Sequence, residues 1–139
     1  MIYAVIDTNV IVSSFLSRHS DSATVQVVRA VVEGSIIPLY NEEIISEYRD
    51  VLSRDYIKPY AKNADELIEV IIEQGLDLEA KPYPNQMPDE DDRVFFEVAL
   101  SAQDSDAKLV TGNIKHFPKV HFVITPGQMM GLLRMGMVS

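Results

Sequence analysis

Short apolar runs alternate along this chain with longer segments whose apolar residues recur every three or four positions. The apolar runs, of which the third is the weakest, predict strands at residues 2–6, 36–39, 76–80, 108–111 and 120–124. The periodic segments predict helices at residues 9–16, 23–33, 41–54, 63–73, 92–103 and 127–135. Strands that alternate with helices are typical of an α/β fold, with a mostly parallel sheet covered by helices on both faces.

The breaks between these elements follow ordinary capping and turn chemistry. Asn41 is a favourable N-cap for the helix that follows it, and Gly34 and Gly75 each follow a predicted helix. Residues 81–88 contain three prolines, which predict a loop. Because no repeat or low-complexity linker divides the 139 residues, we expect a single domain spanning residues 1–139.

The composition narrows the kinds of site that the chain can build. The sequence has no cysteine, which excludes both disulfides and thiolate metal ligands. No apolar stretch approaches the ~20 residues of a membrane span, and residues 1–6 lack the basic start of a signal peptide. We therefore expect a cytoplasmic protein that makes no membrane contact.

The net charge of −9 argues against a broad nucleic-acid-binding surface, because binding a polyanion draws on lysine and arginine. That objection weakens if several carboxylates are clustered around a divalent cation, because the ion reverses the local charge. The position of the acidic residues therefore matters more than their number.

In an open parallel sheet, ligands bind at the carboxyl ends of the strands, so polar residues directly after strands are the first candidates. Asp7, Thr8 and Asn9 directly follow the first predicted strand. A carboxylate at the end of a buried run is unfavourable unless it is paired, hydrogen-bonded or bound to a cation. The alternative interpretation of Asp7 is a simple helix N-cap.

A second acid comes from the predicted helix 41–54. Its apolar residues form one face, and Glu47 lies at the edge of that face, whereas Glu42, Glu43 and Asp50 point away from it. Glu47 is therefore the acid of this helix best placed to face inward. The alternative is a solvated acid on a helix surface.

Four adjacent acids, residues 89–92, precede the apolar start of the helix predicted at 92–103. Acids at a helix start also interact favourably with the helix dipole, which is the simpler interpretation. Four neighbouring carboxylates repel one another, however, and Asp91 and Asp92 both fall towards the apolar side of the helix. An oxygen-rich, cysteine-free cluster suits Mg²⁺ or Mn²⁺ better than zinc.

Thr111, Gly112 and Asn113 follow the predicted strand 108–111 and repeat the pattern seen after the first strand. A Gly-Asn pair is also good turn chemistry, so this motif is weak alone. We expect it to lie beside the end of the first strand.

In this order and spacing, Asp7-Thr8-Asn9, Glu47, Asp92 and Thr111-Gly112-Asn113 resemble the motifs of the PIN-domain family. The resemblance covers nearly the whole chain, and it is closest to small prokaryotic PIN proteins classed as toxin components of toxin–antitoxin pairs. It implies a three-layer α/β/α fold around a mostly parallel sheet of about five strands. It also implies a Mg²⁺- or Mn²⁺-dependent endoribonuclease that hydrolyses RNA phosphodiester bonds.

The resemblance further implies a ligand set and partners. The metal is held by Asp7, Glu47 and Asp92, with Asn113 as a fourth ligand. Alternative candidates for the third acid are Asp89 and Asp91. The residues that orient ligands or substrate are Thr8, Asn9 and Thr111. The implied partners are RNA, a second copy in a homodimer and, for a toxin, an antitoxin protein. Asn113 departs from the family, where many nucleases have Asp, and a neutral carbonyl holds a second metal less firmly.

Contacts with backbone phosphates are weakly predicted for Arg18, Arg54, Lys115 and His116, the last being more often a packing residue than a catalyst. Two other functions stay open. A non-catalytic PIN-like module that binds protein or RNA would agree with Asn113 and the negative charge. A phosphatase of the haloacid-dehalogenase type needs an acid two residues after its first Asp, where this chain has Asn9.

Overall fold

The computed structural model describes residues 1–138 and contains five parallel strands in one sheet, in the order β3-β2-β1-β4-β5. The strands are β1 (Ile2–Ile6), β2 (Ile36–Tyr40), β3 (Leu76–Asp77), β4 (Lys108–Val110) and β5 (Val123–Ile124). The predicted parallel sheet of about five strands is therefore confirmed.

The central strand β1 is apolar because both of its faces are covered. Ala4, Val5 and Ile6 are buried, as expected for a parallel strand between two helical layers. The strand pairs with β2 on one side and with β4 on the other, where Ile6 lies opposite Val110. The carboxyl ends of β1 and β4 therefore meet at the same edge of the sheet.

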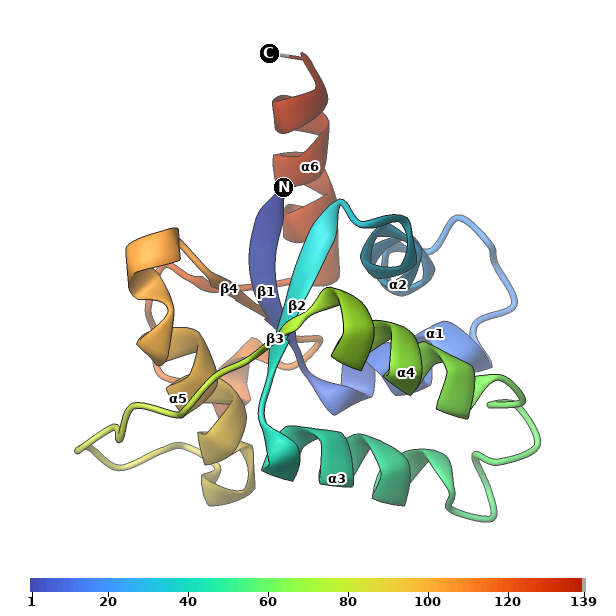
Figure 1. Ribbon diagram of the computed structural model, residues 1–139, viewed down its shortest axis with the longest axis horizontal. Helices are drawn as coiled ribbons and strands as arrows, with labels where there is room; N and C mark the ends of the chain where they lie inside the picture. Colours follow the sequence, from blue (N-terminus) through green and yellow to red (C-terminus); the bar gives the residue numbers. More distant parts are fainter. Residues whose placement is uncertain (139) are drawn as a thin grey trace.

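Helices cover both faces of the sheet, so the chain has the expected three-layer α/β/α architecture (Figure 1). One face packs against α5, which contacts β1, β2 and β4, while α2 and α4 pack on the other face with α1 and α6 beside α2. The helices are α1 (Thr8–Leu16), α2 (Ala23–Glu33), α3 (Glu42–Leu52), α4 (Ala64–Gln74), α5 (Arg93–Ser101) and α6 (Pro126–Val138).

The helix α3 lies past the carboxyl end of β2 and contacts α1, α4 and α5 (Figure 1). Its start is capped as predicted, because the Asn41 side chain accepts a hydrogen bond of 2.9 Å from the Ile44 N–H. Buried Tyr48 fastens the helix to the sheet, since its hydroxyl donates to the Ile6 carbonyl oxygen at 2.5 Å. This bond joins α3 to the last residue of β1.

Two glycines end helices for different physical reasons. Gly34 follows α2 with a φ of 88°, a left-handed conformation that favours glycine. Its N–H donates hydrogen bonds to the carbonyl oxygens of Ala30 and Val31, in the last turn of the helix. Gly75 follows α4 where a Cβ would lie 2.2 Å from the carbonyl oxygen of Pro38. The chain between α4 and β3 thus passes too close to β2 for any side chain.

Some boundaries differ from the prediction. The strand predicted at 120–124 is reduced to β5, because residues 120–123 form a turn in which the Val123 N–H donates to the Val120 carbonyl oxygen. The edge strand predicted at 76–80 is only two residues long. Two short 3₁₀ helices were not predicted, η1 (Glu90–Asp92) and η2 (Gln103–Ser105), whereas the 3₁₀ helix η3 (Ile114–His116) follows β4 as the repeated strand-end pattern predicts. Within residues 1–138, none of the helices has the length and apolar character to cross a membrane.

Candidate active site

Asp7 is a buried carboxylate at the end of the central strand, with 5% of its surface exposed. It occupies the N-cap position of α1, but its side chain makes no capping hydrogen bond. Its Oδ2 instead accepts a bond of 2.7 Å from the Thr111 hydroxyl, which follows β4. Burial, and then repulsion by Asp92, raise the pKa of Asp7 to about 6, while the Thr111 bond opposes this rise. The simple N-cap interpretation therefore does not account for Asp7.

Glu47 reaches the same edge of the sheet from α3. Its half-buried carboxylate accepts a short hydrogen bond from the hydroxyl of Thr8, directly after Asp7. Burial raises the pKa of Glu47, and the Asp7 carboxylate adds to the rise. Glu47 therefore lies at the margin of the buried face of α3, as its position in the helical pattern predicts.

Asp92 is the third carboxylate and ends η1, directly before α5. Its side chain is 18% exposed. Burial raises its pKa, repulsion by Asp89 and Glu47 adds to the rise, and a hydrogen bond with His116 opposes it. Asp7, Glu47 and Asp92, hereafter the acid triad, therefore come from three elements and affect one another electrostatically.

No lysine or arginine forms an ion pair with the acid triad within the described part of the chain. Three partly or fully buried carboxylates that repel one another, without such a partner, are an unfavourable arrangement unless a cation binds. Their donor atoms are all oxygen, which fits a hard divalent ion such as Mg²⁺ or Mn²⁺. The residues present therefore fit the metal that the family resemblance implies.

The segment after β4 is fastened to the segment after β1. The Asn9 side-chain oxygen accepts a bond of 3.2 Å from the Gly112 N–H, and Thr111 Oγ1 accepts one of 3.0 Å from the Asn113 N–H. Since Thr111 also donates to Asp7, one threonine connects Asp7 with Asn113. The predicted neighbourhood of the two strand ends is confirmed by these contacts.

The acidic run 89–92 divides into different roles, which corrects the expectation of four mutually repelling carboxylates. Asp89 caps η1 by accepting from the Asp91 N–H at 3.1 Å. Glu90 pairs with Arg93 at 2.7 Å, which lowers its pKa to about 2. Asp91 is exposed rather than turned towards the apolar side, although its charge contributes to the raised pKa of Glu47.

His116 lies against this run, although the sequence pattern indicates it only as a weak candidate for a phosphate contact. Its Nδ1 is 3.1 Å from Asp92 Oδ2 and 3.4 Å from Asp89 Oδ2, and its Nε2 is 2.8 Å from Asn113 Nδ2. The ligand atoms of Asp89, Asp92 and His116 all lie within 4.8 Å of one another, a spacing that could also hold a metal ion. The available signal was the three-residue spacing of Asn113 and His116, which puts both side chains on one side of a 3₁₀ turn.

The basic side chains selected for phosphate contacts are dispersed. Arg54 is paired with Asp50 at 3.1 Å, whereas Arg18 and Lys115 are exposed. Lys115 belongs to η3, between Asn113 and His116. It is thus the cation closest in sequence to the polar residues after β4.

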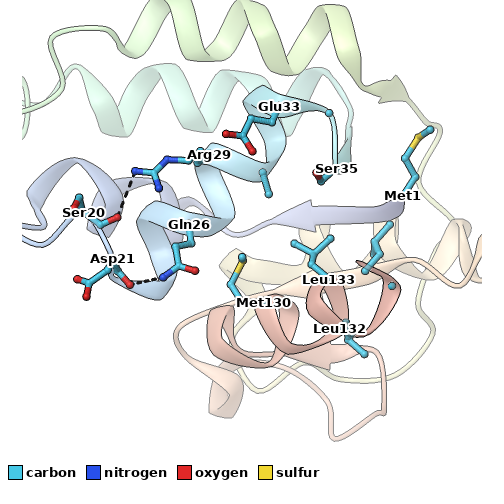
Figure 2. Close-up of a pocket in the computed structure, with 14 residues that line it drawn as sticks. Met1, Ser20, Asp21, Gln26, Arg29, Glu33, Ser35, Met130, Leu132 and Leu133 are labelled. Carbon is cyan, nitrogen blue, oxygen red and sulfur yellow. Dashed lines mark hydrogen bonds between the residues drawn. The ribbon is translucent and has the colours of Figure 1, made fainter. Parts of the chain in front are cut away.

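A separate hollow of about 800 Å³ lies at the opposite, amino-terminal end of the strands. Figure 2 shows it between α2, which contributes Gln26 and Arg29, and α6, which contributes Met130, Leu132 and Leu133. None of the acid triad lines it. The hollow and the candidate active site are therefore different places on the molecule.

A comparison with protein-family models gives a match over most of the chain. A family model described as PIN domain matches residues 3–115, a range that includes the acid triad and Asn113. Neither the search of curated proteins nor the search of solved structures returns a match. The matched range covers most of the chain, so this protein belongs to the PIN-domain family.

Proposed function

We propose that this protein is a Mg²⁺- or Mn²⁺-dependent endoribonuclease whose metal is held by Asp7, Glu47 and Asp92, with Asn113 as a further ligand. PIN domains are generally metal-dependent nucleases, and membership of the family supports the reaction class. The observation that carries the proposal is the acid triad itself. Its three carboxylates come from separate elements, raise one another's pKa values and form no ion pair with a lysine or arginine among the described residues.

The surrounding residues would hold these ligands in place. Thr8 donates to Glu47, and Thr111 donates to Asp7, so each of the two carboxylates has one oxygen bound to a hydroxyl. Tyr48 fixes the α3 backbone beside Glu47 by bonding the end of β1. Fixed ligands of this kind maintain the coordination geometry that a metal site needs.

The bound ion would supply a water of lowered pKa and would offset charge on the scissile phosphate. Asp7, Glu47 and Asp92 would bind and orient that ion, and Lys115 would contact a neighbouring phosphate from the rim. Asn113 brings no negative charge, so a second ion would be held less firmly than in relatives with Asp at this position.

The test is cleavage of an end-labelled RNA, and of a DNA of the same sequence, with Mg²⁺, Mn²⁺ or a chelator. The variants Asp7→Asn and Glu47→Gln remove ligands, while Glu43→Gln is a matched control on the exposed side of α3. We expect metal-dependent RNA cleavage that both ligand variants lose and the control keeps.

Equal cleavage by all four proteins would indicate a contaminant and contradict the proposal. Binding of RNA without cleavage by the native chain would favour the non-catalytic PIN-like module. Membership of the PIN-domain family argues against the haloacid-dehalogenase alternative. That alternative needs an acid at position 9, where this chain has Asn9, and the Asn9 side-chain oxygen accepts a hydrogen bond from the Gly112 N–H.

We further propose, from the family resemblance, that the chain acts in the cytoplasm as a single PIN-like domain, as a homodimer, and as a toxin held by an antitoxin protein. Exposed apolar side chains such as Met135, 71% exposed at the end of α6, are compatible with a protein partner. Sedimentation analysis of the purified chain tests the dimer, and co-expression with the neighbouring gene product tests the antitoxin.

A further inference from the structure

His116 lies between two of the proposed metal ligands, which belong to separate turns of the chain. It belongs to η3, whereas Asp92 ends η1, so the imidazole ring spans two turns that are far apart in sequence. Its side chain is 44% exposed and so is not needed to fill the core. The side chain is therefore better explained by its polar contacts than by packing.

Only one arrangement of protons on the neutral ring satisfies both neighbours. An ionised carboxylate can only accept, so the Nδ1 facing Asp92 at 3.1 Å must carry the proton. The Nε2 of the same neutral ring then accepts, and the Asn113 Nδ2 that lies 2.8 Å away must donate. The side-chain NH₂ of Asn113 therefore faces the His116 ring, and the side-chain carbonyl oxygen of Asn113 is not used by the ring.

The Asn113 side chain is consequently held in one orientation. No hydrogen bond within residues 1–138 uses its Oδ1, while its backbone N–H is bound to Thr111, which in turn donates to Asp7. A continuous path of hydrogen bonds thus runs from Asp7 through Thr111, Asn113 and His116 to Asp92. An amide suits this path, because it donates to the ring through nitrogen and keeps an oxygen available.

We propose that His116 is a positioning residue of the metal centre: its Nδ1–H fixes Asp92, and its Nε2 holds Asn113 with the carbonyl oxygen turned free to ligate a divalent cation. This inference rests on the proposed function and deepens it, because it explains how a neutral residue serves where relatives have Asp. His116 and Asn113 then form a matched pair, since an aspartate at position 113 could not donate to Nε2.

The first test is the tautomer of His116 in the metal-free, ¹⁵N-labelled chain, measured by NMR well above the ~6.5 pKa of a free imidazole. We expect the Nδ1–H tautomer for His116, and the commoner Nε2–H tautomer for exposed His19 and His121. The Nδ1 proton should persist when Mg²⁺ is added. An Nε2–H tautomer, or loss of the Nδ1 proton with Mg²⁺, would overturn the inference, the latter by showing direct ligation beside Asp89 and Asp92.

The second test is Mn²⁺ affinity. Removing a group that orients ligands commonly weakens binding about 10- to 100-fold, and we expect a loss of about 10-fold for His116→Ala. His116→Asn keeps a donor near the Nδ1 position, and His116→Gln keeps an acceptor near the Nε2 position, so each should recover part of the loss. His121→Ala is the matched control and should bind as the native chain does.

The Asn113 side-chain NH₂ signal separates the two contacts. It should move in His116→Ala and His116→Asn, and stay near its native position in His116→Gln, which retains the acceptor. Native affinity for Mn²⁺ in His116→Ala would overturn this inference alone. Absence of Mn²⁺ binding by the native chain would overturn the proposed function, and the role of His116 with it.

Discussion

At the scale of single residues, the site places a charge where the fold disfavours it. Asp7 is 5% exposed, and its side chain accepts a hydrogen bond from the neutral hydroxyl of Thr111 rather than from a charged donor. Its pKa of about 6 in the folded chain lies above the ordinary value of 3.8 because burial penalises the charged form. Folding and ionisation of Asp7 therefore oppose each other in the absence of metal.

The sign of the resulting pH dependence follows from this difference. Below pH ~4 the carboxyl group is protonated in both the folded and unfolded chains, and its contribution to stability is fully present. As the pH rises through about 6, the folded chain is forced to ionise Asp7, and that contribution is lost. A rise of roughly two pKa units corresponds to about 2–3 kcal/mol.

Asp7→Asn should therefore stabilise the metal-free chain by about 2–3 kcal/mol at pH 8, because the amide keeps an acceptor for Thr111 without the buried charge. The difference should vanish below pH ~4. Urea unfolding across this pH range measures it, with exposed Asp104→Asn as the control. A variant less stable than the native chain at pH 8 in chelator would contradict the raised pKa of Asp7.

At the scale of elements, α3 carries Glu47 but depends on its neighbour Tyr48 for its position. The Tyr48 hydroxyl is buried and donates to the Ile6 carbonyl, and burial raises its pKa, so it remains a donor. Tyr48→Phe should destabilise the chain by about 1–2 kcal/mol, because a buried carbonyl loses its donor. Exposed Tyr60→Phe serves as the control in urea unfolding, and an unchanged midpoint for Tyr48→Phe would contradict this role.

The passage from α4 to β3 sets a second limit on the sequence. Gly75→Ala should lower stability by about 2 kcal/mol or more, because its Cβ would lie 2.2 Å from the Pro38 carbonyl oxygen and force the backbone to move. Gly131→Ala in α6 has open space and should raise stability by up to ~1 kcal/mol. Thermal unfolding of both variants should shift in opposite directions, and shifts of the same sign would contradict this explanation.

The elements differ in how well the sequence predicts them. The central strand and the helices can be predicted from the sequence, because β1 is a continuous apolar run and α2 to α5 each have an apolar face and recognisable ends. The short edge strand β3 and the strand β5 are poorly predicted, because pairing with a neighbour rather than side-chain pattern fixes their length. The same holds for the 3₁₀ turns, whose signals are only three residues long.

The site shows the same limit. Asp7, Glu47 and Asp92 are accessible to sequence reasoning, because each sits at a strand end or at the margin of an apolar helix face. His116 is not, because its meaning depends on a contact with Asp92, 24 residues away in the chain. Likewise, only the fold separates Asp92 from Glu90, whose charge is neutralised locally by Arg93.

At the scale of the whole molecule, the net charge of −9 limits how the proposed RNA substrate can bind. Few unpaired cations surround the acid triad, so affinity should depend on the divalent ion more than on phosphate contacts. We expect a shallow dependence of RNA affinity on NaCl, with a log–log slope of about −1.4 to −2.1, equivalent to two or three phosphate contacts with a single strand. Filter binding in Ca²⁺ at several salt concentrations measures the slope. A steep slope would indicate a larger basic RNA-binding surface and would contradict this prediction.

The most direct test of the account is a calorimetric titration of Mn²⁺ into the metal-free chain. We predict a single ion per chain, an affinity that increases as the pH rises through about 6 because Asp7 must lose its proton, and at least ~100-fold weaker binding by Asp7→Asn. Asp104→Asn should bind as the native chain does. Native binding of Mn²⁺ by Asp7→Asn, or no binding by the native chain, would contradict a metal centre built on the acid triad.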